Sequence, residues 1–169
     1  DWRERSDHGG SGAEGTGAGG NILVKANSVT LQNGGTLSAK TSGTKASATG
    51  GTITVNANQV HLNSGGLITA STTRAGAGGT ITVDATNTVT MNSASITASS
   101  TGTADAGSIN ITSPNGFTMQ SSTITTQAGQ GAGGGNIKVT TSPAATVLLQ
   151  DSLISASVAD GHGGGGNIS

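Results

Sequence analysis

The sequence contains no cysteine and almost no aromatic side chains, and these absences exclude several kinds of fold and site. Its 169 residues include one Trp, one Phe, no Tyr and two Pro. Without cysteine, disulfides are excluded as a source of stability, and so are thiolate metal ligands. Ordinary globular domains have more than the 31% apolar and 1% aromatic residues found here, so a single large core is not expected.

Charge is scarce as well, and no stripe of one sign runs along the sequence. Seven Lys and Arg stand against eight Asp and Glu, a net charge of −1. Without a basic stripe we expect no nucleic-acid partner. No apolar run reaches the roughly 18 residues of a membrane span. The first residues also lack the apolar stretch of a signal peptide, and we expect the chain to be a piece of a longer protein.

What the sequence does contain is a repeat. Five copies open on two small residues followed by x-Ile-x-Val or x-Ile-x-Ile, and a sixth begins where the sequence stops. The copies start at residues 19, 50, 78, 106, 134 and 165, at intervals of 31, 28, 28, 28 and 31 residues. Many Gly, Ser and Thr with few charges are also typical of disorder. Disorder does not explain Ile and Val at fixed offsets, and a period of this length predicts a stack of structural units.

Each copy reads as three short strands. In the third copy, residues 80–85 alternate polar and apolar with period two, which indicates a half-buried strand. A second strand follows at 89–91 and a third at 95–98, and a small polar loop over 99–105 returns to the next copy. No helical period appears. The pattern therefore predicts an all-β fold, a right-handed parallel β-helix (a solenoid) of about five rungs of about 28 residues.

Two details of the rungs carry further predictions. An amide follows every second strand, and we expect stacking to line these amides into a hydrogen-bonded ladder. Its members are Gln32, Asn63, Asn92, Gln120 and Gln150. The paired small residues at each start, such as Gly78-Gly79, are interpreted as a corner. The sequence thus divides into residues 19–169, the β-helix repeats, and residues 1–18, an irregular segment with Trp2 that is either a loop of an upstream rung or a tail.

The residues that carry chemistry do not converge on a site. Asp84 faces outward on the first strand of its rung, Asp151 lies in a turn, and Asp105 and Asp160 lie in loops, so no two carboxylates share a spacing for acid–base work. His61 points outward, and His8 and His162 sit in glycine-rich loops without a second histidine at ligand spacing. We therefore predict no catalytic, cofactor-binding or metal site, and no enzyme.

The repeat pattern resembles a known family. G-G-x-I-x-V-x-A, then V-x-L, then G-x-I-x-A before a polar glycine-rich loop is similar to the repeat region of bacterial exoproteins of the filamentous haemagglutinin type, the secreted partners of two-partner secretion systems. The resemblance covers about residues 19–169. It implies a right-handed β-helix shaft, export across an outer membrane, a location at the bacterial cell surface or outside the cell, and a role in attachment or matrix.

From the residues and the resemblance together we expect a structural segment of an adhesin-like surface protein. Exposed strand edges at the two ends would be covered by flanking rungs or by other copies joined end to end into a filament. One alternative is a binding module whose variable loops contact surface glycans or neighbouring cells. A second is a carbohydrate-active enzyme, for which Asp84 would be the residue to test.

Overall fold

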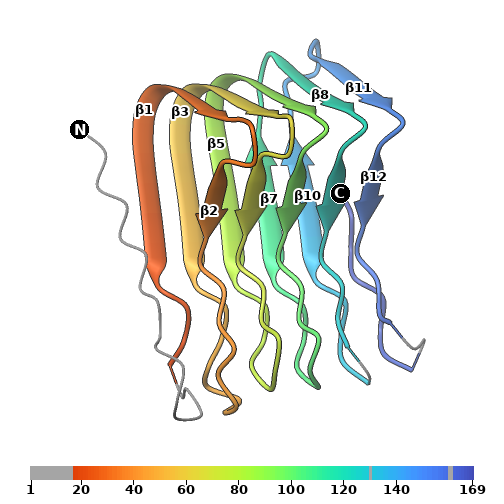
Figure 1. Cartoon of the computed structure of the whole chain (residues 1–169). Helices are drawn as coiled ribbons and strands as arrows, with labels where there is room; N and C mark the ends of the chain where they lie inside the picture. The colour runs from red at the N-terminus through yellow and green to blue at the C-terminus, as the bar shows by residue number, and fades with distance from the viewer. Residues whose placement is uncertain (1–16, 130, 160–161) are drawn as a thin grey trace.

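The chain forms a parallel β-solenoid of about five turns, seen in a computed structural model that describes residues 17–129, 131–159 and 162–169 (Figure 1). The rungs lie side by side along the axis of the stack, and those described residues contain strands and no helix. The predicted fold class is confirmed. Trp2 and the rest of residues 1–16, with His8, lie outside the described residues, as does Asp160.

The strands follow the predicted order, but the first two strands of a rung are often one. In rungs 1 to 3 a single long strand runs over the top of the rung in Figure 1, whereas rungs 4 and 5 have three separate strands. The strands are β1 (Asn21–Leu31) and β2 (Thr36–Ser38); β3 (Thr52–Asn63) and β4 (Leu67–Thr69); β5 (Thr80–Asn92) and β6 (Ser95–Thr97); β7 (Ser108–Thr112), β8 (Gly116–Gln120) and β9 (Thr123–Thr125); β10 (Asn136–Thr140), β11 (Thr146–Gln150) and β12 (Leu153–Ser155). The expectation of two separate strands at 80–85 and 89–91 is therefore wrong, because β5 continues through residues 86–88 with a shift of register against β3.

All pairs between neighbouring rungs are parallel, and equivalent residues lie directly over one another. One sheet joins β1, β3, β5, β7 and β10 in that order, and β8 and β11 continue from the second half of β5. The other sheet joins β2, β4, β6, β9 and β12. Ile53, for example, pairs with Ile22 on one side and with Ile81 on the other. The intervals of 28 and 31 residues between copies in the sequence are thus the intervals of the stack.

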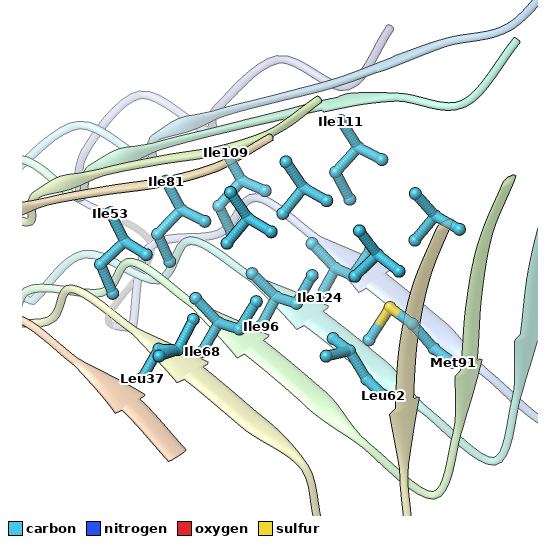
Figure 2. Packing of buried hydrophobic residues seen from close by; sticks show 14 of the residues in the cluster. Leu37, Ile53, Leu62, Ile68, Ile81, Met91, Ile96, Ile109, Ile111 and Ile124 are labelled. Carbon is cyan, nitrogen blue, oxygen red and sulfur yellow. The ribbon is translucent and has the colours of Figure 1, made fainter. Parts of the chain in front are cut away.

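The inward residues form continuous apolar columns inside the coil. Figure 2 shows Ile53, Ile81 and Ile109 in one row, facing a second row that includes Ile68 and Ile96. All five side chains are completely buried. Burying each large aliphatic side chain stabilises the fold by roughly 1.5–3 kcal/mol, and each packs on its equivalents in the rungs above and below. The core is therefore a narrow column that no single rung could close alone.

The paired glycines do not make a corner by unusual backbone angles. They stand at a waist, where the chain leaving the third strand and the chain entering the next rung meet below the strands (Figure 1). The Gly79 amide donates to the Ala70 carbonyl at 2.6 Å, and Gly51 donates to Ala39 at 2.8 Å. Neither glycine has a positive φ. Glycine is needed for space, because a Cβ on Gly79 would overlap the carbonyl oxygen of Gly51.

Beyond the waist, the variable loops stack as well. We call them arms: residues 40–49, 71–77, 99–105, 127–133 and 157–164. Thr41, Thr72 and Ser100 bridge one another in parallel, as do Ala128 and Val158. Thr72 and Ser100 are both 1% exposed, and both of their hydroxyls donate to the carbonyl oxygen of Gly76. The described residues of the arms, expected from the sequence to be polar loops, thus also enclose a buried interior of small residues.

A left-handed residue turns the chain between the second and third strands of every rung. Asn33, Ser64, Ser93, Ser121 and Asp151 have φ between 47° and 54°. Serine hydroxyls then complete the backbone bonds at this bend. Ser122 Oγ accepts the Ala94 amide of the rung below at 3.2 Å and donates to Gln120 O at 2.7 Å, and Ser152 repeats the arrangement for Ser122.

The predicted amide ladder is only half present. Asn63, Asn92, Gln120 and Gln150 do stack in register. Among the described residues, however, no side-chain amide of this column donates to another, and the one hydrogen bond to such a side-chain amide is from Ser93 Oγ to Asn92 Oδ1 at 3.2 Å. The amides are exposed or half-buried, so water competes for their hydrogen bonds. An amide pair does bond elsewhere, between Asn115 Nδ2 and Asn87 Oδ1 at 3.0 Å.

Candidate functional surfaces

Asp84, the residue whose substitution would test enzymatic function, lies in the outward-facing row of the first strands. Lys25, Asn56, Asp84 and Thr112 pair successively across rungs 1 to 4. Asp84 is exposed, and its flanking partners are an amide and a hydroxyl. An exposed carboxylate with no second acid beside it in the row has no arrangement for paired acid–base chemistry.

The other described acids stand apart from Asp84 and perform backbone roles. Asp105 Oδ1 accepts the amide of Gly133 at 2.6 Å, which ties the third arm to the fourth. Asp151 occupies the left-handed bend of rung 5, with a φ of 49°, and is exposed. Aspartate is one of the few residues other than glycine that readily adopt this backbone conformation. Asp105 thus has a structural role, Asp151 stands at a bend, and neither lies in the outward row of Asp84.

The histidines are likewise dispersed. His61 Nδ1 lies 2.6 Å from Thr90 Oγ1. Thr90 is the pairing partner of His61 in the next rung, so a side-chain hydrogen bond joins these two outward-facing residues. His162 is an exposed residue of the fifth arm. Across residues 17–129, 131–159 and 162–169, no three His, Cys, Asp or Glu residues are grouped as metal ligands would be.

The apolar residues left in solvent mark the C-terminal end of the stack. Val147 and Leu149 continue the buried column of Val60, Leu62, Val89 and Met91, yet they are 49% and 47% exposed. Leu153, which starts β12, is 56% exposed. The last residues cover only the first part of this end: Ile168 bridges Ile137, and Ser169 exchanges hydrogen bonds with Ile137 and Val139. Strands β11 and β12 keep one edge without a described partner.

The N-terminal end differs. Val29 and Leu31, the equivalents of Val147 and Leu149, are only 1% and 7% exposed, and Leu37 of β2 is 7% exposed. Along the outer edge of β1, Leu23 is 61% exposed, and in the described part of the molecule β1 pairs with β3 alone. The two ends of the stack therefore differ, and the more exposed apolar surface lies at β11 and β12.

Comparisons with protein-family models, with curated proteins and with solved structures gave no match for this sequence. In the described segments, no helix is long and apolar enough to cross a membrane.

The sequence did not predict the waist, the buried interior of the arms or the bend that serine hydroxyls close. A signal for the waist was available in Ala39, Ala70 and Ala98, which follow the third strand at one fixed position and each accept the amide of the second opening residue, a glycine, of the next rung.

Proposed function

We propose that the chain is a segment of a structural shaft in an adhesin-like exoprotein at a bacterial cell surface. The observation that carries this proposal is that the recurring residues serve rung stacking. The apolar columns, the waist glycines, the bend serines and the small residues of the arms all contact their equivalents in neighbouring rungs. Such a quasi-one-dimensional stack provides length and stiffness without requiring a ligand.

The finer assignment, to exoproteins of the filamentous haemagglutinin type with export by two-partner secretion, is supported by the repeat pattern alone. The absence of cysteine suits a shaft that is held by packing and backbone bonds in an oxidising environment outside the cell. Secretion can be tested directly. Antibody against the protein should label intact source cells, and labelling only after the cells are broken would contradict the cell-surface location.

We further propose that the C-terminal end accepts another rung of the same pattern, from flanking repeats or from a second copy joined head to tail. Rung 1 carries Val29, Leu31 and Leu37 at the same stacked positions that Val147, Leu149 and Ile154 occupy in rung 5. Charge favours this polarity, because residues 19–49 contain Lys25, Lys40 and Lys45 without an acid, whereas residues 134–164 contain one lysine and two aspartates. Unlike charges attract over about a Debye length.

The joint between copies has a specific test because the protein has no native cysteine. Thr30 and Leu148 occupy the same outward column, so Thr30→Cys with Leu148→Cys should place two thiols on adjacent strands across a head-to-tail joint, within disulfide reach. Oxidation should then give a ladder of covalent oligomers. The matched control is Thr30→Cys with Gln150→Cys, which shifts one thiol two residues along β11 and should cross-link poorly.

The outcomes separate the two parts of the proposal. Oligomers from the first pair but not from the control would support the in-register joint. Monomer only, at concentrations where the protein stays soluble, would overturn joining of copies and leave flanking rungs as the cover of β11 and β12. Equal cross-linking of both pairs would indicate random collision and would also overturn the register.

A further inference from the structure

Two Asn-Gly steps occur in the sequence, Asn33-Gly34 and Asn115-Gly116. In such a step the backbone nitrogen of the glycine can attack the amide carbon of the preceding side chain, because no Cβ hinders its approach. Both steps lie in bends of the solenoid, but in different surroundings. The difference decides which of them can react in the folded protein.

Asn33 is open to solvent and lightly held. It is exposed at the bend that follows β1, with a φ of 54°, and Gly34 has a φ of 79°. A Cβ placed on Gly34 would meet no atom within 4 Å. The Asn33 side chain makes no hydrogen bond to a described residue, and the Gly34 amide makes one long bond, 3.1 Å, to Ser64 O. Because rung 1 ends the described stack, only one neighbouring rung restrains this bend.

Hydrogen bonds hold both the side-chain amide and the backbone amide of Asn115. Its Nδ2 donates to Asn87 Oδ1 at 3.0 Å, and its backbone amide donates to Asn87 O at 2.9 Å. Gly116 belongs to β8, which pairs with β5 on one side and with β11 on the other. An attack by the Gly116 nitrogen would require the Asn115 side chain to leave Asn87 and the bend to move between two rungs. We therefore expect the folded structure to retard this step.

We infer that Asn33 is a site of spontaneous deamidation in the folded protein, with water as the only co-reactant. The Gly34 nitrogen forms a bond to Cγ of Asn33. The bond between Cγ and Nδ2 of Asn33 breaks, and Nδ2 leaves as ammonia together with the proton of the Gly34 amide, which gives a cyclic imide. Water then opens the imide at one of its two carbonyls, and the product is either aspartate or isoaspartate.

The fold tolerates one product better than the other. Aspartate already occupies the equivalent bend of rung 5, where Asp151 has a φ of 49° against 54° for Asn33. Isoaspartate instead adds a methylene to the backbone between β1 and β2, and this extra length disturbs the pairing of Thr36 and Leu37 with β4. The modification therefore adds a negative charge to an otherwise cationic first rung and, as isoaspartate, loosens β2.

The experiment follows both asparagines by peptide mapping of the full-length protein incubated in mildly alkaline buffer, with and without denaturing urea. In urea the two steps should convert at similar rates, because both are Asn-Gly. In the folded protein Asn33 should convert about threefold to tenfold faster than Asn115, the ratio that one hydrogen bond of ordinary strength imposes. Equal rates in the folded protein, faster conversion of Asn115, or no conversion of Asn33 would overturn the inference.

A variant tests the structural reason. Asn87→Ala removes the acceptor for Asn115 Nδ2 and leaves the backbone bond in place, so conversion of Asn115 should accelerate while that of Asn33 stays the same. Unchanged conversion of Asn115 would show that the hydrogen bond to Asn87 does not protect it, and would overturn the argument. Asn33→Asp is the matched product, and its unfolding midpoint should equal that of the unmodified protein.

Discussion

Gly79 and Ala70 face each other at a waist of the solenoid, where the Gly79 amide donates to the Ala70 carbonyl at 2.6 Å. A Cβ on Gly79 would come within 2.9 Å of the Ala70 Cβ, and would also overlap the carbonyl oxygen of Gly51 in the rung below. The nearest atoms are the backbone of Gly50 and Gly51 and the methyl group of Ala70, none of which can turn away. No side-chain rotation can make room, so the waist is the most restrictive element of the rung.

The waist predicts that Gly79→Ala destabilises the protein by about 1–3 kcal/mol, the usual cost of forcing extra atoms into a packed site. The matched control is Gly20→Ala, at the equivalent position of rung 1, where an added Cβ meets nothing within 4 Å. The control should change the free energy of unfolding by no more than about 0.5 kcal/mol. Urea denaturation of both variants measures the difference, and equal losses would contradict the role given to the waist.

Thr126 occupies the inward position that Ala39, Ala70, Ala98 and Ala156 hold in the other rungs, and its buried Oγ1 has no hydrogen-bond partner. Thr126→Ala should therefore raise the free energy of unfolding by about 1 kcal/mol, because the unsatisfied hydroxyl is removed. Thr125→Ala, one residue earlier and half-buried on the outward side, should bring no gain. A decrease in the thermal midpoint of Thr126→Ala would show that packing of the threonine methyl outweighs the cost of its hydroxyl.

Ser122 closes the bend between the second and third strands by accepting the Ala94 amide and donating to Gln120 O. Ser122→Ala leaves the buried Ala94 amide without an acceptor, so stability should fall by about 1–3 kcal/mol. Ser121→Ala changes the neighbouring serine, which is exposed and makes no side-chain hydrogen bond among the described residues, and should be close to neutral. Calorimetry of the two variants distinguishes a specific bond from a general loss of serine.

The parts of this fold that repeat with apolar residues could be predicted from sequence. Period-two alternation at Ile81 and Val83, repeated every 28 residues, determines which side chains face inward and which residues stack, and the structure agrees. The division into strands was less accurate. Rungs 3 and 4 have the same number of residues between these two strands, yet β5 is continuous while β7 and β8 are separate, so the apolar pattern does not encode the break.

The waist and the arms were not predicted because their signals are not hydrophobic. Alanine, serine and glycine occur both in exposed loops and in tightly stacked ones, so composition cannot distinguish Thr72 buried in an arm from a threonine in solvent. The amide ladder failed for a related reason. Register placed Asn92 over Gln120 as expected, but exposed amides hydrogen-bond water as readily as each other.

The equal intervals of the middle rungs predict that one whole rung can be removed. Deleting residues 78–105 joins Ala77 to Ala106 and places Ser108 over Thr52 and Phe117 over Val60, since rung 3 pairs with both neighbours at the same positions. The shortened protein should fold and give the same β-rich circular dichroism spectrum. Its free energy of unfolding should depend less steeply on urea concentration, roughly in proportion to the surface lost. Deleting only residues 78–91 removes nearly all of β5 but keeps β6, so β6 is no longer part of a complete rung. This deletion should prevent cooperative folding. If both deletions behaved alike, the rung would not be the unit of this fold.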